Sequence, residues 1–329
     1  MRGWFIAVGT VLAVVGTFTQ ASAQTSAPAS AQTWPSKPIR IIVPLTAGSA
    51  SDVMGRIVAD QLSAQLGQPI VVENRPGAGN TIGMSAVAKA EPDGHTLLIN
   101  SSTHTVTPAT RSNLGFEMTD LAPIIPLGNM PVVMVFNPSK GYKTLGDFVA
   151  YAKANPGKIN YTSAGAGNSS HLNGERFRLA AGIEAVHLPF KGAPEATTEV
   201  IAGRADFYFS PLVNALALIK EGTVQPLAVS GSSRASALPD VPTTVEAGIP
   251  NSEYNFWVGL FAPAKTPAEI RARLQAEMAK ALQAPAVREK LKTLGADPMP
   301  LDSAQFDALV KREIETNTQL VKAAGIKVN

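Results

Sequence analysis

The sequence contains no cysteine among its 329 residues, and this absence excludes several kinds of chemistry. Without thiols the chain has no disulfide, no thiolate metal site and no cysteine nucleophile. Charged residues make up 16% of the chain and hydrophobic residues 45%, a composition typical of globular proteins with a large core. We therefore expect a fold that is stabilised by core packing without covalent cross-links.

Runs of basic charge are also lacking. The chain has 28 Lys and Arg against 25 Asp and Glu, and the basic residues are scattered along it. A nucleic-acid-binding protein usually gathers its Lys and Arg into a patch that tracks phosphates. We therefore expect no nucleic-acid partner.

Several catalytic and cofactor motifs are missing. The chain has no G-x-x-x-x-G-K-[ST] phosphate loop, no G-x-S-x-G elbow and no H-E-x-x-H pair. The glycines of "PIVVENRPGAGNTIG" imitate a dinucleotide fingerprint, but their spacing differs, and a Gly-rich turn is the favoured interpretation. No carboxylate lies at metal-ligand spacing from any of the four histidines, His95, His104, His171 and His187. We expect no metal, no cofactor and no enzymatic activity.

The N-terminus has the pattern of a secretory signal peptide. Arg2 is followed by the apolar segment "WFIAVGTVLAVVGTF" and by the small-x-small triplet "ASA" at 21–23. A membrane anchor is the alternative, but the apolar run is short for a span. We predict a signal peptide over 1–23, with cleavage as late as 31, a flexible leader over 24–33, and export to the periplasm.

A local unit of strand, small-residue loop and helix recurs along the chain. "IRIIV" leads through "TAGSASD" to an amphipathic helix, and "INYTS" leads through "AGAGNSS" to another. Strands that alternate with helices predict α/β units with mainly parallel sheets. The length of the chain favours two domains.

Two long apolar strands indicate where the chain passes between these domains. "MPVVMVFNP" begins at Met130 and "YNFWVGLFAP" at Tyr254, and each follows a stretch rich in Pro. We predict a discontinuous first domain, residues 34–130 plus 254–329, and a second domain, residues 131–253. The C-terminal part reads as helices that pack on the first domain. One begins with a capping box of Thr266, Pro267 and Glu269, and the last spans about Ser303 to Ala324.

Three loops at strand ends are rich in Ser, Thr, Gly and Asn: "TAGSASD", "SSTHT" and "TSAGAGNSS". Two of them open helices, whose N-terminal amides and partial positive charge can hold a carboxylate or phosphate without a Lys. One of these two lies in each predicted domain. Such an arrangement is typical of a solute-binding protein that closes on its ligand. His104 and His171 lie in such loops, and the sequence leaves both a functional and a structural role open for them.

The residues at this point resemble a known family. "WPSKPIRIIVPLTAGSASDVMGRIVADQL" is similar to the start of the tripartite tricarboxylate transporter solute-binding proteins, also called the Bug family. The resemblance continues through "LPFKGAPEATTEVIAGRADFYF", "LPDVPTTVEAGIP" and "WVGLFAPAKTPAEI". It implies the type II periplasmic binding protein fold, with two α/β domains joined by two crossing strands around a central cleft. It also implies a ligand among di- and tricarboxylates, acidic amino acids and aromatic acids.

The resemblance carries a set of ligand-binding residues onto this chain. Asp52 is acidic, so we expect it to cap the helix and brace its loop rather than touch an anion. Ser49 departs from the Gly that the family commonly has, and this leaves the precise ligand open. The complete expected set is Thr46, Ala47, Gly48, Ser49, Ser51, Asp52, Ser102, His104, Ser163, Ala164, Gly167, Asn168, Ser169, His171, Phe190 and Lys191.

We therefore expect a monomeric, non-enzymatic periplasmic protein that delivers a small carboxylate to membrane permease subunits. Two alternatives stay open at this point. In the first, the same fold senses the ligand and signals to a membrane kinase. In the second, the chain is an exported hydrolase that uses His171 and a loop serine; the missing elbow and the missing carboxylate that would orient the histidine argue against it.

Overall fold

The computed structural model describes residues 1, 3–4, 34–111 and 113–326. Residues 1–34 form one unit and residues 35–329 another. The predicted signal peptide and leader lie almost entirely outside the described residues. Within the described ranges, no helix combines the length and the apolar character that crossing a membrane requires.

Residues 35–329 contain two five-stranded sheets, and the first has the order β2-β1-β3-β10-β4. Strand β1 pairs in parallel with β2 on one side and with β3 on the other. Strand β10 lies between β3 and β4 and is antiparallel to both. The β-branched segment "IRIIV" forms β1, which is almost wholly buried, as a central strand requires. The strands are β1 (Ile39–Val43), β2 (Ile70–Asn74), β3 (Thr96–Ser101), β4 (Leu121–Asn129) and β10 (Trp257–Pro263).

The second sheet has the order β7-β6-β8-β5-β9. Strands β7, β6 and β8 are parallel, and β5 runs antiparallel between β8 and β9. Rings from β5, β8, α4 and α5 form its aromatic core, in which Phe136 lies 4.8 Å from Phe148 between centroids. The strands are β5 (Val132–Phe136), β6 (Ile159–Ser163), β7 (Ala185–Pro189), β8 (Phe207–Pro211) and β9 (Gln225–Val229).

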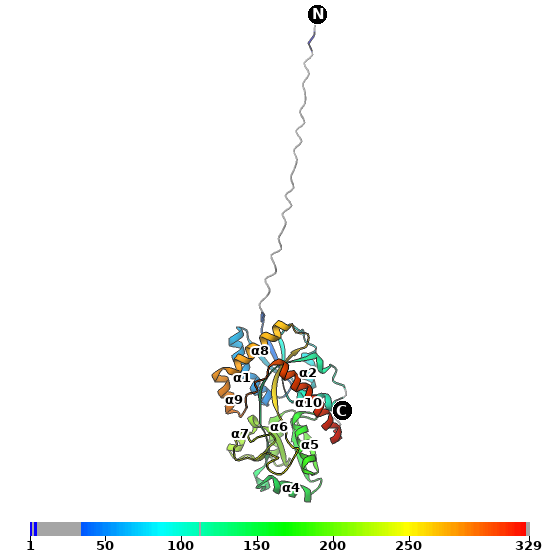
Figure 1. The fold of residues 1–329 in the computed structure, drawn as a ribbon, viewed down its shortest axis with the longest axis vertical. Helices are drawn as coiled ribbons and strands as arrows, with labels where there is room; N and C mark the ends of the chain where they lie inside the picture. The colour runs from blue at the N-terminus through cyan, green and yellow to red at the C-terminus, as the bar shows by residue number, and fades with distance from the viewer. Residues whose placement is uncertain (2, 5–33, 112, 327–329) are drawn as a thin grey trace. The chain divides into compact units, whose positions relative to one another are not determined.

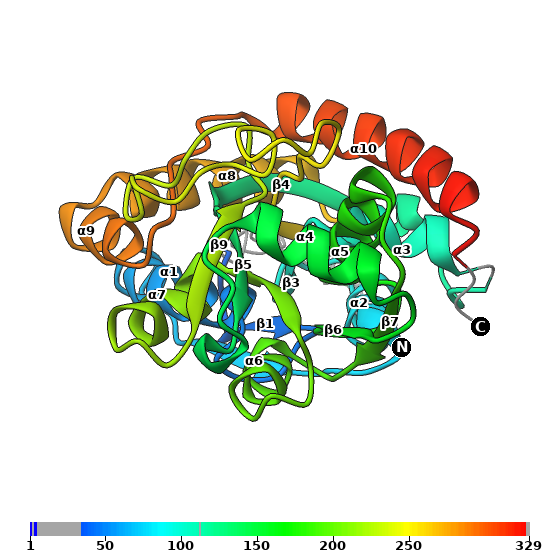
Figure 2. The ribbon, with the colours of Figure 1, turned by 90° about the horizontal axis from the view of Figure 1, so that it is seen from below.

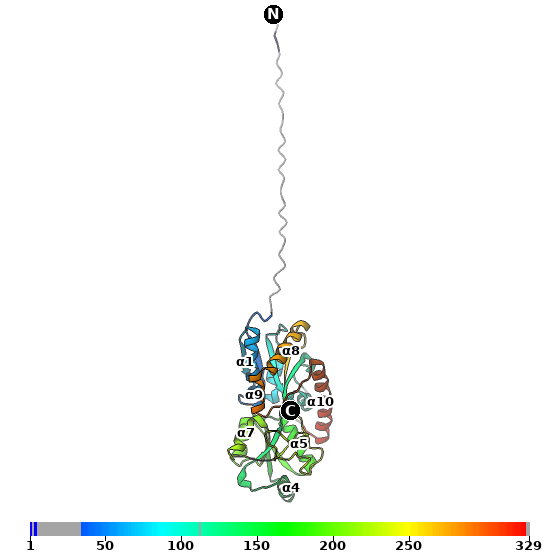
Figure 3. The ribbon, with the colours of Figure 1, turned by 60° about the vertical axis from the view of Figure 1, so that its left-hand side comes forward.

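Each sheet has its own helices, as Figures 1 and 3 show. Around the first sheet lie α1 (Ala50–Leu66), α2 (Thr81–Ala88), α3 (Thr103–Thr110), α8 (Ala268–Gln283), α9 (Pro285–Thr293) and α10 (Ser303–Ala324). Around the second lie α4 (Leu145–Ala154), α5 (Ser169–Ala181), α6 (Ala193–Ile201) and α7 (Leu212–Lys220). Figure 2 shows α10 running along β4 and past α3. Short 3₁₀ turns occur at η1 (Ala78–Asn80), η2 (Met118–Asp120) and η3 (Pro138–Lys140).

The chain passes between the sheets twice. It leaves the first sheet after β4 to form β5, and it returns after β9 to form β10. The predicted strands at these two places are therefore present. The prediction of mainly parallel sheets was wrong for them, because β5 and β10 are antiparallel to both of their neighbours.

Two local predictions also differ from the structure. Strand β4 was not predicted, because Pro123 and Pro126 interrupt its pattern; it lies at the sheet edge, where proline is tolerated. The capping box at Thr266 is absent, since α8 begins at Ala268 with Pro267 as its N-cap and without a side-chain cap. Thr266 instead closes a turn by donating its N–H to Pro263 O at 3.0 Å, and its side chain is buried. The last helix spans Ser303–Ala324 as predicted.

Candidate ligand-binding site

The first small-residue loop joins β1 to α1 and is braced from below by Asp52. Its carboxylate accepts hydrogen bonds from Gly48 N at 2.9 Å, from Arg56 Nε at 3.0 Å and from Asn74 Nδ2 at 3.0 Å. Burial raises the pKa of Asp52, but these hydrogen bonds outweigh it and leave the pKa below its usual value. Asp52 is therefore ionised, and both of its carboxylate oxygens already accept hydrogen bonds. Asp52 braces the loop as predicted, but it is not the helix cap: α1 begins at Ala50, so its N-cap is Ser49 and Asp52 lies in its first turn.

The N-terminus of α1 retains free donors. Ser49 makes no side-chain cap, so the first amides of the helix are not satisfied by a capping hydroxyl. The hydroxyls of Ser49 and Ser51 are buried, and neither has a hydrogen-bond partner within the described structure. A buried hydroxyl without a partner costs about 1–3 kcal/mol. This turn therefore presents two hydroxyls and helix-end amides that a carboxylate would satisfy.

The second small-residue loop joins β6 to α5 and is held by its own side chains. Asn168 caps α5 by accepting from His171 N at 3.0 Å. Ser170 Oγ donates to Asn168 Oδ1 and accepts from Ala164 N, both at 2.9 Å. Gly167 adopts a φ of 74°, which favours glycine. The loop is thus preformed by hydrogen bonds that Ser170 and the expected site residues Ala164, Asn168 and His171 make with one another.

Two stacked imidazoles lie beneath this second loop. The rings of His171 and His187 are 3.8 Å apart between centroids and 6° from parallel. His171 Nδ1 accepts from Gly167 N at 3.1 Å, and His187 Nε2 lies 2.6 Å from Ser163 Oγ. Burial lowers the pKa of His171 to about 4 and that of His187 to about 3. Both rings are therefore neutral near pH 7 and fix the loop from its inner side.

Each loop is joined by hydrogen bonds to a helix that belongs to the opposite sheet. Ser169 N donates to Thr103 Oγ1 at 3.0 Å, which joins the start of α5 to the start of α3. Thr46 Oγ1 donates to Glu195 Oε2 at 3.2 Å, and Asn214 Nδ2 donates to Gly48 O. Each bond joins an element around the first sheet to one around the second. The amide oxygen of Asn214 is itself buried without a partner.

The Gly-rich segment after β2 also takes part in this contact. Residues 77–80 all have positive φ, from 47° at Ala78 to 126° at Gly77, so the segment is a left-handed turn into α2. A Cβ on Gly79 would come within 2.6 Å of Ala166 O in the second loop. Arg111 Nη2 donates to that same carbonyl at 3.2 Å. Glycine is required at position 79 because the Gly-rich segment and the second loop approach each other closely there.

The remaining predicted residues are less closely gathered. His104 stacks on Phe261 at 4.1 Å between centroids, and burial lowers the pKa of its ring to about 3. No hydrogen bond or ring contact joins His104 to the second loop in the described structure. Ser102 Oγ lies 3.4 Å from Tyr254 OH. Phe190 is half-buried and pairs its N–H with Ser163 O at 2.9 Å, while Lys191 and Ala47 are exposed.

Sequence reasoning missed several residues of this region. Asn100, at the end of β3, holds Asn80 Nδ2 at 3.1 Å with its oxygen, and its own amide nitrogen is buried without a partner. Glu195 and Asn214 reach the first loop from α6 and α7. Each of these residues lies at a strand end or in the first turn of a helix. Their position was the signal that could have assigned them to the site, but a single polar residue at a strand end or helix start forms no recognisable motif.

A family model described as "Tripartite tricarboxylate transporter family receptor" matches residues 54–326. The chain belongs to this receptor family. Among its relatives, protein BugT of Bordetella pertussis is 36% identical over 323 residues, which covers 97% of this chain and 98% of BugT.

Solved structures agree with the family assignment. Rpa4515 of R. palustris, solved with adipate, has a TM-score of 0.86 at 30% identity and covers 89% of this chain and 99% of its own. MatC from Rhodopseudomonas palustris, solved with bound malate, has a TM-score of 0.83 at 32% identity and covers 88% and 100%. The resemblance to the Bug family and the predicted α/β fold are thus confirmed. The receptor family consists of solute-binding proteins rather than enzymes.

Proposed function

We propose that this receptor captures a small organic carboxylate between the first and second loops. The observation that carries the proposal is the uncapped start of α1, where the hydroxyls of Ser49 and Ser51 are buried without partners. The positive end of the helix dipole, the backbone amides of the first turn and the two hydroxyls suit a carboxylate. The adipate and malate bound by two related proteins support the same ligand class.

We further propose that closure of two domains encloses the ligand. The domains are residues 34–130 plus 254–329 and residues 131–253, so each carries one five-stranded sheet. The hydrogen bonds from Ser169 to Thr103 and from Thr46 to Glu195 then join the closed faces. In this scheme the ligand adds its own contacts to both loops and shifts the equilibrium towards the closed form.

The membrane components of a tripartite tricarboxylate-type transporter are the proposed partners, and the described family supports this. We place the protein in the periplasm, as a monomer exported by the predicted signal peptide over 1–23. Related structures are described as periplasmic binding proteins. Mass spectrometry of the exported protein tests the cleavage site directly. An unprocessed N-terminus in the exported protein would contradict the signal peptide.

Calorimetric titration of the mature protein against succinate, malate, adipate and citrate tests the function. We expect at least one acid to bind with one-to-one stoichiometry. Ser51→Ala should weaken its binding by roughly tenfold, because a hydrogen bond to a charged group contributes about 1.5–3 kcal/mol. Ser139→Ala, a change in the exposed turn η3, is the matched control and should leave binding unchanged. Binding of neutral solutes but of no carboxylate would refute the proposal.

A further inference from the structure

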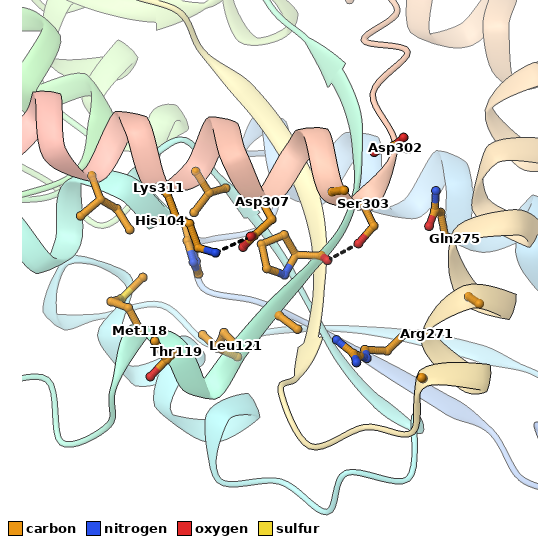
Figure 4. A pocket seen from close by; sticks show the side chains of 17 residues that line it. His104, Met118, Thr119, Leu121, Arg271, Gln275, Asp302, Ser303, Asp307 and Lys311 are labelled. Atoms are coloured by element: carbon orange, nitrogen blue, oxygen red, sulfur yellow. Dashed lines mark hydrogen bonds and ion pairs between the residues drawn. The ribbon is translucent and has the colours of Figure 1, made fainter.

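A separate cavity of about 750 Å³ lies between α8, α10 and β4 (Figure 4). It belongs to the region around the first sheet, and none of the second-loop residues lines it. His104 is the one member of the expected ligand set that does, and its ring lies on Phe261. A volume of this size is in the range of sites that hold small molecules.

The floor of the cavity is apolar. Leu121 and Pro123 line it from β4, Met118 from η2, and Val310 and Ile314 from α10. Met118 and Ile314 are only partly buried and pack against the core cluster around Phe261 and Phe306. A ligand in this cavity therefore needs an apolar body.

Most polar groups at the rim already have partners. Asp302 caps α10 by accepting from Gln305 N at 2.8 Å, and Asp307 pairs with Lys311 at 2.6 Å. Ser303 Oγ donates to Pro123 O at 2.9 Å. Asp307 is thus neutralised by Lys311, and Asp302 holds the start of α10 with one of its carboxylate oxygens.

Arg271 is the charged side chain in the lining that has no partner among the described residues. Figure 4 shows its side chain extending from α8 into the cavity. Its guanidinium has no ion pair or hydrogen bond to any described residue, and its Nε is buried. The helix that carries it begins at Ala268, which also lines the cavity, and has no side-chain cap. An unpaired guanidinium next to an uncapped helix start above an apolar floor is complementary to an anion with an apolar tail.

We propose that this cavity is a second binding site, which holds an amphiphilic carboxylate. The guanidinium of Arg271 pairs with the carboxylate, and the alkyl or aromatic body packs on Met118, Leu121 and Ile314. The ligand differs from that of the loop site, because the loop site is built from hydroxyls and amides, whereas this cavity has an apolar floor with the unpaired Arg271 at its rim.

Calorimetric titration of the mature protein with octanoate tests this site. Arg271→Gln should raise the dissociation constant roughly tenfold or more, because a charge-assisted hydrogen bond is lost. Arg273→Gln removes the same charge two residues along α8, outside the cavity lining, and should leave octanoate binding unchanged. Ala304→Trp, on the exposed surface of α10, should fill the cavity and weaken octanoate binding even if Arg271→Gln folds poorly.

Three results would overturn the proposal. The first is the absence of octanoate binding up to about 10 mM, because a specific site of this size should give a much lower dissociation constant. The second is equal binding by the wild type and Arg271→Gln. The third is loss of octanoate binding in Ser51→Ala with retention in Arg271→Gln, which would place octanoate in the loop site. Malate or adipate binding should be unchanged in Arg271→Gln, so failure of one site is distinguishable from failure of the other.

Discussion

Gly192→Ala offers a sharp test of the idea that the first loop closes on the helices around the second sheet. Gly192 is buried at the start of α6 with a φ of −170°, an extended conformation that alanine adopts without strain. A Cβ at this position would overlap Thr46 Oγ1 and lie 2.9 Å from Glu195 Oε2. The substitution therefore pushes apart two faces that belong to different sheets, while the packing within each sheet stays intact.

The expected magnitude follows from the contact that is lost. The hydrogen bond from Thr46 to the Glu195 carboxylate spans 3.2 Å and is half-exposed, so its contribution is about 1 kcal/mol. Displacement of the first loop adds to this loss, and we expect the dissociation constant of the carboxylate ligand to rise roughly tenfold. The free energy of unfolding should fall by less than about 1 kcal/mol, the cost of alanine at a helix N-cap.

Calorimetric titration and urea unfolding measure these two quantities. Gly146→Ala in α4 is the matched control, because a Cβ there meets only Thr144 Oγ1 at an ordinary 3.5 Å. The double variant Thr46→Ala with Gly192→Ala should recover part of the affinity, since the overlapping hydroxyl is gone. Wild-type affinity in Gly192→Ala, or a loss of affinity with no recovery in the double variant, would refute the reasoning.

Three further predictions concern buried ionisable groups. Asp52→Asn should lower the free energy of unfolding by about 1–3 kcal/mol in urea titrations near pH 7, because the amide cannot satisfy all three donors. The pKa of Asp52 is lower in the folded than in the unfolded chain, so the ionised carboxylate stabilises the fold above the unfolded pKa, and this contribution is lost as pH falls through the folded pKa. The difference between Asp52→Asn and the wild type should therefore vanish in acid. His171 has a pKa lowered from 6.5 to about 4, so the unfolded chain binds its proton first, and this group alone should make unfolding easier by on the order of 3 kcal/mol as pH falls from about 6.5 to about 4. His171→Gln should remove this share of the pH dependence and leave the shares of His104 and His187, and an unchanged pH profile would contradict it. Desolvation raises the pKa of the half-buried Glu313, which accepts from Trp257 Nε1 at 2.9 Å, so Glu313→Gln should stabilise the fold by about 1 kcal/mol at pH 8 and less at pH 4, measured by thermal unfolding. Equal effects at both pH values would argue against a charged, desolvated Glu313 at neutral pH.

Much of the fold could be predicted because its signals are local. The amphipathic pattern and the terminal Gly67 of α1, and the pattern of α10, are properties of consecutive residues. Strand β4 and the start of α8 were missed because both depend on contacts with residues that are distant in the sequence. Pro123 is acceptable only because β4 lies at a sheet edge, and Thr266 fails to cap because a turn buries its side chain.

The candidate site divides in the same way. The sequence predicts both small-residue loops and the bracing role of Asp52, because each follows from a strand, a loop and a helix within about ten residues. It leaves a functional and a structural role open for His104, and the structure adds that the ring lies on Phe261 beside the cavity of Arg271. The direction of a side chain at the start of a helix depends on what packs around that helix, and local spacing carries no such information.

The sequence by itself determined the family, the alternation of strands and helices, and the use of cation-free loops at strand ends. Only the tertiary structure decided which groups meet there. Glu195 and Asn214 reach the first loop across about 150 residues of chain, and His187 stacks beneath the second loop from a neighbouring strand. The unpaired state of Arg271 was equally invisible, because a missing partner is a property of every surrounding element at once. Such contacts are set by sheet order and helix packing, which bring distant residues together and leave no periodic trace in the chain.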